Sequence, residues 1–146
     1  MNLNSMVNLA LKEKEISKHS WALKSNNIAM KKMDKSSFIN NETGIPIDIR
    51  TFFEIDVMKE NSTFQITLEF MKKDYLARIR KGLGEKARTK LLWPSKLTEY
   101  VQMKYPNIYE EFRKNNKVDD NVPYMIFKKI DKKYYKVSFF YKFGRI

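Results

Sequence analysis

Basic side chains are concentrated in one stretch of the chain, between Lys72 and Lys90. This stretch holds two acidic residues, Asp74 and Glu85, and eight basic ones: Lys72, Lys73, Arg78, Arg80, Lys81, Lys86, Arg88 and Lys90. Lysine and arginine gain affinity for a nucleic acid because they displace counterions condensed on its phosphates. A rigid frame that fixes several cations together strengthens their combined field. Nucleic acid is therefore the first partner that this stretch predicts.

The elements expected around this stretch would hold it in a β-sheet. Apolar and polar residues alternate over 64–70 and again over 75–80, which is the period of half-buried strands. A polar turn over 71–74 joins the two runs into a hairpin and places Arg78 and Arg80 on one face. Glycines 82 and 84 then interrupt the pattern before an extended run over 88–93.

The end of the chain combines short helices with a second hairpin. Ser95 is expected to cap a helix that Pro106 ends, and a second short helix is expected over 107–114. Residues 124–130 and 134–141 are rich in β-forming residues and flank a polar turn, so they predict a hairpin.

The first part of the chain has a weaker pattern. Residues 1–27 are expected to form a helical or irregular extension, which leaves a core of about 28–141. A polar bend is expected over 36–43, followed by a shaped loop at Gly44-Ile45-Pro46 and a strand over 52–58.

This order of elements predicts the fold class. Strands, two short helices and further strands, without a βαβ repeat, favour a mostly β (α+β) fold. The expected architecture is a partly open antiparallel pseudobarrel with two short helices at its side. A length of 146 residues predicts one domain over 1–146.

Composition narrows the possible functions. The hydrophobic residues (42 %) and aromatic residues (14 %) are enough for a packed core. The chain has no cysteine, which excludes disulfides, thiolate zinc sites and a cysteine nucleophile. The formal net charge is +12, and most of it lies in residues 61–146, with 20 basic and 9 acidic residues. No apolar run approaches the roughly 18 residues of a membrane span, so we expect a cytoplasmic protein that does not bind membranes.

The residues expected for common enzyme classes are mostly missing. His19 is the sole histidine, and the glycines near Lys86 lack the spacing of a phosphate-binding loop, so no cofactor is expected. A self-contained Mg²⁺-dependent nuclease is the alternative. Carboxylates would hold the metal ion in such an enzyme, and several lie near expected strands of this basic protein. The candidate carboxylates are Asp48, Glu54, Asp56 and Glu69. The acid-x-Lys element of such sites occurs as Asp131-Lys132-Lys133, in an expected hairpin turn.

Aromatic and basic residues interleave over 124–143, which leaves two interpretations open. The aromatic rings could stack on the bases of single-stranded nucleic acid or RNA. The sheet also needs apolar residues at these positions, and Phe127, Val137, Phe139 and Tyr141 are expected to pack in the core. Trp93 is likewise expected to anchor an edge of the core.

Two segments resemble a known family of DNA-recognition domains. The segment Phe38-Ile39-Asn40-Asn41-Glu42-Thr43-Gly44-Ile45-Pro46 resembles a loop of the B-three-like pseudobarrel domains in bacterial restriction endonucleases. The segment Arg88-Thr89-Lys90-Leu91-Leu92-Trp93-Pro94-Ser95 resembles their basic strand with tryptophan. The resemblance covers roughly residues 28–141, and within the family it is strongest to the N-terminal module of LlaJI-type, McrB-related restriction subunits.

This resemblance implies a module that reads a short site in the major groove of double-stranded DNA. Two projecting arms would grip the DNA, an N-arm over 40–50 and a C-arm around 86–96. With the arginines of the first hairpin, the expected contact residues are Asn40, Asn41, Thr43, Arg50, Arg78, Arg80, Lys86, Arg88, Lys90 and Lys96. The chain itself would not be an enzyme. Cleavage and nucleotide hydrolysis would belong to further domains, such as a GTPase, and to a nuclease subunit of a longer restriction protein.

Overall fold

A computed structural model describes residues 17–142, except for 19, 85, 116–117 and 119–120. The strands are β1 (Ser17–Lys18), β2 (Trp21–Ser25), β3 (Ile28–Lys32), β4 (Glu42–Ile45), β5 (Ser62–Phe70), β6 (Lys73–Lys81), β7 (Thr89–Leu92), β8 (Tyr124–Asp131) and β9 (Tyr134–Phe140). The helices are α2 (Lys35–Ile39), the 3-10 helix η2 (Ile47–Phe53), α3 (Ser95–Lys104) and α4 (Pro106–Lys114).

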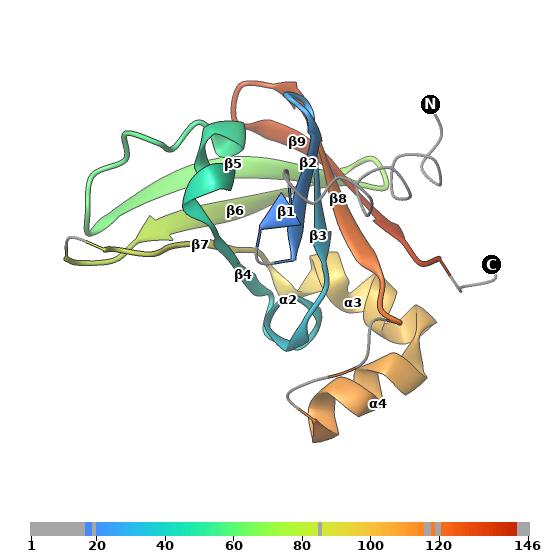
Figure 1. Cartoon of the computed structure of the whole chain (residues 1–146). Helices are drawn as coiled ribbons and strands as arrows, with labels where there is room; N and C mark the ends of the chain where they lie inside the picture. Colours follow the sequence, from blue (N-terminus) through green and yellow to red (C-terminus); the bar gives the residue numbers. More distant parts are fainter. Residues whose placement is uncertain (1–16, 19, 85, 116–117, 119–120, 143–146) are drawn as a thin grey trace.

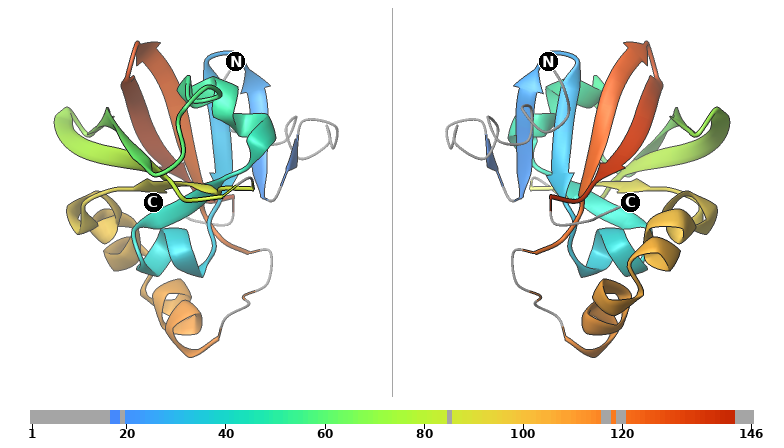
Figure 2. Two further views of the ribbon diagram at one scale, coloured as in Figure 1. Left: turned by 90° about the vertical axis from the view of Figure 1, so that its left-hand side faces the viewer. Right: turned by 90° about the vertical axis from the view of Figure 1, so that its right-hand side faces the viewer.

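The described strands form one curled sheet in the order β1-β2-β3-β8-β9-β5-β6-β7-β4 (Figures 1 and 2). This arrangement confirms the expected mostly β, partly open pseudobarrel with short helices. One pairing differs from the expected antiparallel sheet, because β5 and β9 run parallel. None of the helices in the described part of the chain is long and apolar enough to cross a membrane.

The β5–β6 hairpin follows the predicted alternation closely. Ile66 and Leu68 are buried on the inner face of β5, and Arg78 and Arg80 are exposed on the outer face of β6. The two strands pair from Ser62 opposite Lys81 to Phe70 opposite Lys73. The connecting residues Met71 and Lys72 both have positive φ, the conformation of the tight two-residue turns that match strand twist.

Aromatic side chains fill the interior of the curled sheet. Trp21 stacks on Phe127, with ring centroids 5.6 Å apart, and meets Phe53 edge-on at 5.8 Å. Tyr135 packs against Phe53 and donates its hydroxyl to the carbonyl oxygen of Phe52 at 3.2 Å. The core therefore joins β2, β8, β9 and η2, which lie far apart in the sequence.

One hydrogen bond links strands from the two ends of the sheet order. Nε1 of Trp21 on β2 donates to the carbonyl oxygen of Gly44 on β4 at 2.9 Å. Trp21 is only 1 % exposed, so this bond closes the seam of the partly open barrel from inside. The expected extension over 1–27 is therefore wrong for residues 21–25, which form a core strand. Residues 1–16 and His19 lie outside the described residues.

Helices α2, α3 and α4 pack together at one end of the curled sheet (Figure 2). Phe38 of α2 packs on Phe112 of α4, with ring centroids 5.1 Å apart. Helix α4 confirms the second predicted helix, and α3 ends at Lys104, just before Pro106 as expected. Ser95 is not the cap of α3, however. Pro94 occupies the N-cap position and makes no side-chain capping bond.

Two other expected elements differ from the structure. The bend expected over 36–43 is instead most of α2 and the start of β4. Helix α2 begins with a capping box: Ser37 N donates to Asp34 Oδ1 and Asp34 N donates to Ser37 Oγ. The strand expected over 52–58 is wrong, because Phe52 and Phe53 belong to η2. Both of these neighbouring rings are buried, whereas successive residues of a strand point to opposite faces.

Candidate nucleic-acid interface

The outer surface of β6 and β7 carries a row of cations. Arg80 pairs with Lys90 across the two strands, and the amide of Gly82 donates to the carbonyl of Arg88 at 3.0 Å, which continues the ladder. The alternate residues Ile79 and Leu91 are fully buried, so the cations face away from the core. We define Arg78, Arg80, Arg88 and Lys90 as the basic face.

The arginines of the basic face have no partners within the described part of the chain. Arg78, Arg80 and Arg88 are exposed, and none of their guanidinium groups forms a hydrogen bond or ion pair with a described residue. Lys90 alone is compensated, because its Nζ lies 2.7 Å from Glu42 Oε2. Like charges opposite each other in a sheet reduce stability. Glu42 relieves this repulsion in part because it neutralises Lys90, while Arg80 has no acidic partner among the described residues.

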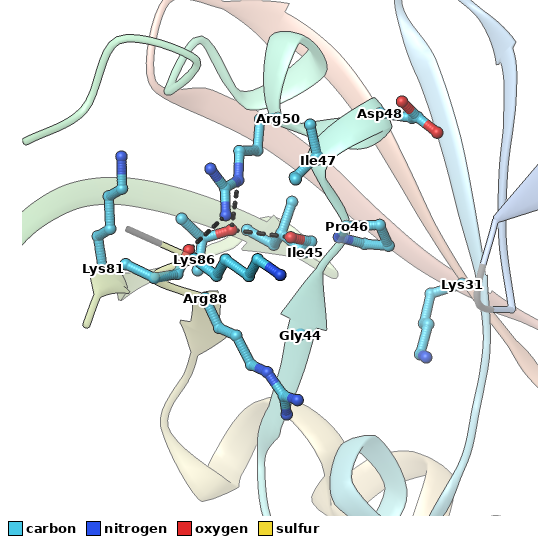
Figure 3. Close-up of a pocket in the computed structure, with 12 residues that line it drawn as sticks. Lys31, Gly44, Ile45, Pro46, Ile47, Asp48, Arg50, Lys81, Lys86 and Arg88 are labelled. Carbon is cyan, nitrogen blue, oxygen red and sulfur yellow. Dashed lines mark hydrogen bonds between the residues drawn. The ribbon is translucent and has the colours of Figure 1, made fainter. Parts of the chain in front are cut away.

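A hollow of about 890 Å³ lies beside the basic face (Figure 3). Figure 3 shows Lys86 and Arg88 on one side of Gly44 and Lys31 on the other. The hollow is lined by Lys31, Gly44, Ile45, Pro46, Ile47, Asp48, Arg50, Lys81, Lys86, Ala87, Arg88 and Thr89. Because Lys81 and Arg88 also line a second hollow of about 510 Å³ with Arg80 and Lys90, the cationic surface continues across both.

Three residues expected on the N-arm have internal roles. Thr43 is 1 % exposed, which corrects its assignment as a DNA contact. Asn41 Oδ1 accepts a hydrogen bond from Thr98 Oγ1 of α3. Arg50 donates from Nε to Thr89 Oγ1 at 3.1 Å and from Nη2 to the carbonyl of Ala87 at 2.8 Å (Figure 3). These side chains position the strands and loop of the surface from behind.

The remaining expected contacts lie on the surface at different places. Lys86, Arg88 and Lys90 lie on or beside the basic face. Asn40 is exposed at the end of α2. Lys96 is exposed in the first turn of α3, with Nζ 3.8 Å from Glu99 Oε1.

The two expected arms are not separate projections along their whole length. Residues 42–45 of the N-arm form β4, which pairs with β7 (residues 89–92) of the C-arm. Backbone hydrogen bonds between these strands prevent them from moving apart as independent arms. Outside the sheet, the N-arm continues into η2, and the C-arm begins in the loop between β6 and β7.

A buried lysine lies at the seam behind the first hollow. Lys31 is 3 % exposed, and its Nζ donates to Ser20 Oγ and to Asp34 Oδ2, the latter at 3.1 Å. Burial lowers the pKa of Lys31, and the nearby Asp34 carboxylate offsets only part of this effect. Burial alone would raise the pKa of Asp34, but Lys31 and the hydrogen bonds from Ser37 outweigh it, so the net shift is downward.

The carboxylates considered for a nuclease are dispersed. Asp48, Glu54 and Asp56 lie on and just after η2, and Glu69 Oε1 accepts from the amide of Lys72 at 3.0 Å. In the described ranges, no three His, Asp or Glu side chains gather closely enough to hold a metal ion. Asp131-Lys132-Lys133 lies at the β8–β9 turn, as predicted.

The aromatic residues of the last hairpin mainly face the core. Phe127 and Val137 are buried, and Phe139 and Tyr141 are half-buried against the same cluster. This confirms the core-packing interpretation for these four residues. Trp93 is 5 % exposed and confirms the expected anchor at the core edge.

The sequence analysis named Lys81 among the basic residues of this region but did not include Trp21 or Lys31. Lys81 was recognisable as basic, but its place in both hollows depends on how β6 leaves the sheet. Strand β2 pairs with its neighbour β3, but the pairing of β3 with β8 and the bond from Trp21 to Gly44 join residues far apart in the sequence, which no local pattern indicates.

No protein-family model matches the chain, and no curated protein matches it. Among solved structures, the chain is similar to the N-terminal domain of Helicobacter pylori LlaJI.R1, at 15 % sequence identity with a TM-score of 0.48. The match covers 81 % of this chain and 83 % of that chain.

Proposed function

We propose that this chain is the double-stranded DNA-binding specificity module of a bacterial restriction system. It reads a short site through the major groove in the cytoplasm, while further domains and a nuclease subunit hydrolyse nucleotide and cut DNA. The observation that carries this proposal is the set of exposed guanidinium groups of Arg78, Arg80 and Arg88, which have no partner among the described residues. Rigid strands hold the first two, and the base of the β6–β7 loop holds the third.

The dimensions of the basic face suit a duplex. Alternate residues of a strand are about 6.8 Å apart, so Arg78 and Arg80 span about two base-pair rises of 3.4 Å. The major groove is about 12 Å wide and admits a two-stranded β-ribbon. Strands β6 and β7 lie inside the sheet between β5 and β4, so the connection beyond the ends of β6 and β7 is the part that would enter the groove (Figure 1). This geometry supports duplex DNA over a single strand.

The residue types also support sequence reading. Arginine can donate two hydrogen bonds to O6 and N7 of guanine, whereas lysine mainly binds phosphate. The exposed arginines can therefore contact bases, and Lys86 and Lys90 can hold the backbone on either side. Arg50 and Asn41 keep the supporting strands and loop in place through their internal hydrogen bonds.

Selection from a randomised duplex library tests the proposal. The purified chain is equilibrated with the library at about 150 mM salt, where non-specific phosphate binding is weak. We expect enrichment of one short motif. The triple variant Arg78→Ala, Arg80→Ala, Arg88→Ala should lose this enrichment, whereas Arg113→Ala on α4 should retain it. Retention of duplexes without any enriched motif would contradict a specificity module.

We also propose that the chain has no cleavage activity of its own. The experiment incubates the purified chain with plasmid and linear DNA in Mg²⁺ or Mn²⁺. No cutting is expected. Cutting that disappears in Asp56→Ala or Glu69→Ala would instead establish the self-contained nuclease.

A further inference from the structure

An apolar side chain lies in the loop beside the basic face. Leu83 is 73 % exposed and lies between Gly82 and Gly84, in the connection from β6 to β7. Figure 1 places this connection at an outer edge of the molecule, beyond the ends of β6 and β7. Single exposed leucines are common on protein surfaces. The surroundings of Leu83 distinguish it from such a residue.

Backbone hydrogen bonds hold the loop in a defined shape. Its base is closed by the amide of Gly82, which donates to the carbonyl of Arg88 at 3.0 Å, and by that of Ala87, which donates to Gly84 at 3.1 Å. Gly84 has φ +104°, a conformation that a residue with a side chain rarely adopts. The loop therefore presents Leu83 from a formed turn.

The preceding segment fixes the loop from outside the hairpin. The amide of Gly84 donates to Glu60 Oε2 at 3.1 Å, and the amide of Asn61 donates to the carbonyl of Gly82 at 3.0 Å. These bonds join the loop to the chain entering β5. The residues on both sides of Leu83 are therefore held in place, and its side chain points away from the core.

Cations flank the leucine on the same loop. Lys81 precedes it, and Lys86 and Arg88 follow it, with all three lining the first hollow (Figure 3). If these cations bind phosphates along a groove, the loop between them points toward the base pairs. An apolar group at that place has no favourable contact with phosphate or water. In the groove it can bury its surface against the methyl group of a thymine or between two base pairs.

We propose that Leu83 is a wedge that enters the DNA at one base step and partly unstacks it. This inference rests on the proposed duplex-binding function and adds a mechanism of indirect readout to it. Proteins that insert leucine or similar side chains between base pairs kink the duplex, and flexible pyrimidine–purine steps deform most easily. The wedge would therefore favour sites with such a step beneath the loop, independently of any base-edge hydrogen bond.

Fluorescence of 2-aminopurine tests the wedge, because unstacking of this base increases its emission. The probe is the duplex enriched by the library selection, with 2-aminopurine replacing each adenine in turn. Wild-type chain should raise the emission severalfold at one step. Leu83→Met should retain this rise, since it keeps a long apolar side chain, and Leu83→Ala should lose it while still binding by fluorescence anisotropy. Met103→Ala, at a 74 % exposed position on α3, is the matched control and should behave as wild type.

The outcomes separate the wedge from the proposed function. Binding of the enriched duplex without a rise at any step would overturn the wedge and leave the DNA-binding function intact. The same would follow from equal rises with wild type and Leu83→Ala. Failure of the selection itself would overturn the proposed function, and the wedge would then fall with it.

Discussion

The two tryptophans of the chain differ in whether their ring N–H has a partner. Nε1 of Trp21 donates to the carbonyl of Gly44, whereas Nε1 of Trp93 is buried without a hydrogen-bond partner among the described residues. Leaving a buried polar group unpaired costs about 1–3 kcal/mol. Trp93 already bears this cost, while Trp21 avoids it by closing the barrel seam.

We predict that Trp21→Phe lowers the free energy of unfolding more than Trp93→Phe. Both changes shrink the ring in the same way, but only the first removes a hydrogen bond, which leaves the Gly44 carbonyl with the longer bond of 3.3 Å from Thr43 Oγ1. The expected difference is about 1 kcal/mol or more. Urea unfolding followed by circular dichroism measures it. Equal losses for the two variants would show that the seam bond adds nothing.

Single arginine variants should separate contact residues from supporting ones. Removing one phosphate contact reduces the slope of log affinity against log salt by about 0.9, and losing a bidentate base contact costs about 1–3 kcal/mol. We expect Arg78→Ala, Arg80→Ala and Arg88→Ala each to show one of these losses without a change in stability. For an interface with about six phosphate contacts, the wild-type slope would be near −5. Binding isotherms across a salt series provide the measurement.

Arg50→Ala should give the opposite result to these exposed arginines. Its guanidinium bonds Thr89 and the Ala87 carbonyl, so its removal loosens the loop end of β7 and lowers stability. Unchanged affinity in Arg78→Ala, Arg80→Ala and Arg88→Ala would show that the basic face is not the surface that contacts DNA.

At the scale of the element, α2 depends on one carboxylate with two roles. Asp34 caps the helix through Ser37 and also bonds the buried Lys31. Its pKa is held below its ordinary value of 3.8. The ionised form therefore stabilises the fold, fully above the unfolded pKa, and this contribution is lost as pH falls through the lower folded pKa. The Lys31 pKa is lowered from 10.5, so its charged form costs stability below the folded pKa, and this cost is lost as pH rises through 10.5.

We predict that Asp34→Ala lowers stability by more than about 1 kcal/mol at neutral pH, because it removes the cap and the partner of Lys31. Asp34→Asn is the matched variant, since asparagine can still cap the helix but carries no charge. Both variants should lose the part of the acid dependence that falls below the ordinary pKa of 3.8, measured by urea unfolding across pH. An acid dependence identical to wild type would contradict the role of the carboxylate.

Elements with a strong local pattern were the ones that the sequence predicted. The β5–β6 and β8–β9 hairpins and helices α3 and α4 carry their own alternation, turns or helix-ending proline. Helix α2 and η2 were not predicted. The first is short and needs its capping box, and the second is helical because Phe52 and Phe53 both pack into the core made by distant strands.

At the scale of the whole molecule, the closing contact of the barrel comes from β2. Trp21 contacts Phe53 and Phe127 and bonds Gly44, so it joins three parts of the chain. Loss of a large buried aromatic side chain typically costs about 3–5 kcal/mol. The lower boundary of the core therefore lies before residue 21 rather than at 28.

A truncation series tests this boundary. A chain that begins at residue 28 should be far less stable than one that begins at residue 17, because only the second retains Trp21 and its seam bond. Thermal unfolding by circular dichroism compares the two. Equal melting temperatures of the two chains would show that residues 17–27 are a dispensable extension.

The sequence by itself determined the class of the fold, the β5–β6 hairpin and the outward direction of Arg78 and Arg80. These features follow from local periodicity, because adjacent residues in a strand face opposite sides. Tertiary structure decided which candidate contacts are available. Pairing of β4 with β7 buries Thr43 and joins the two expected arms, and packing behind the loop engages Arg50. Such outcomes depend on contacts between residues tens of positions apart, which no local pattern encodes.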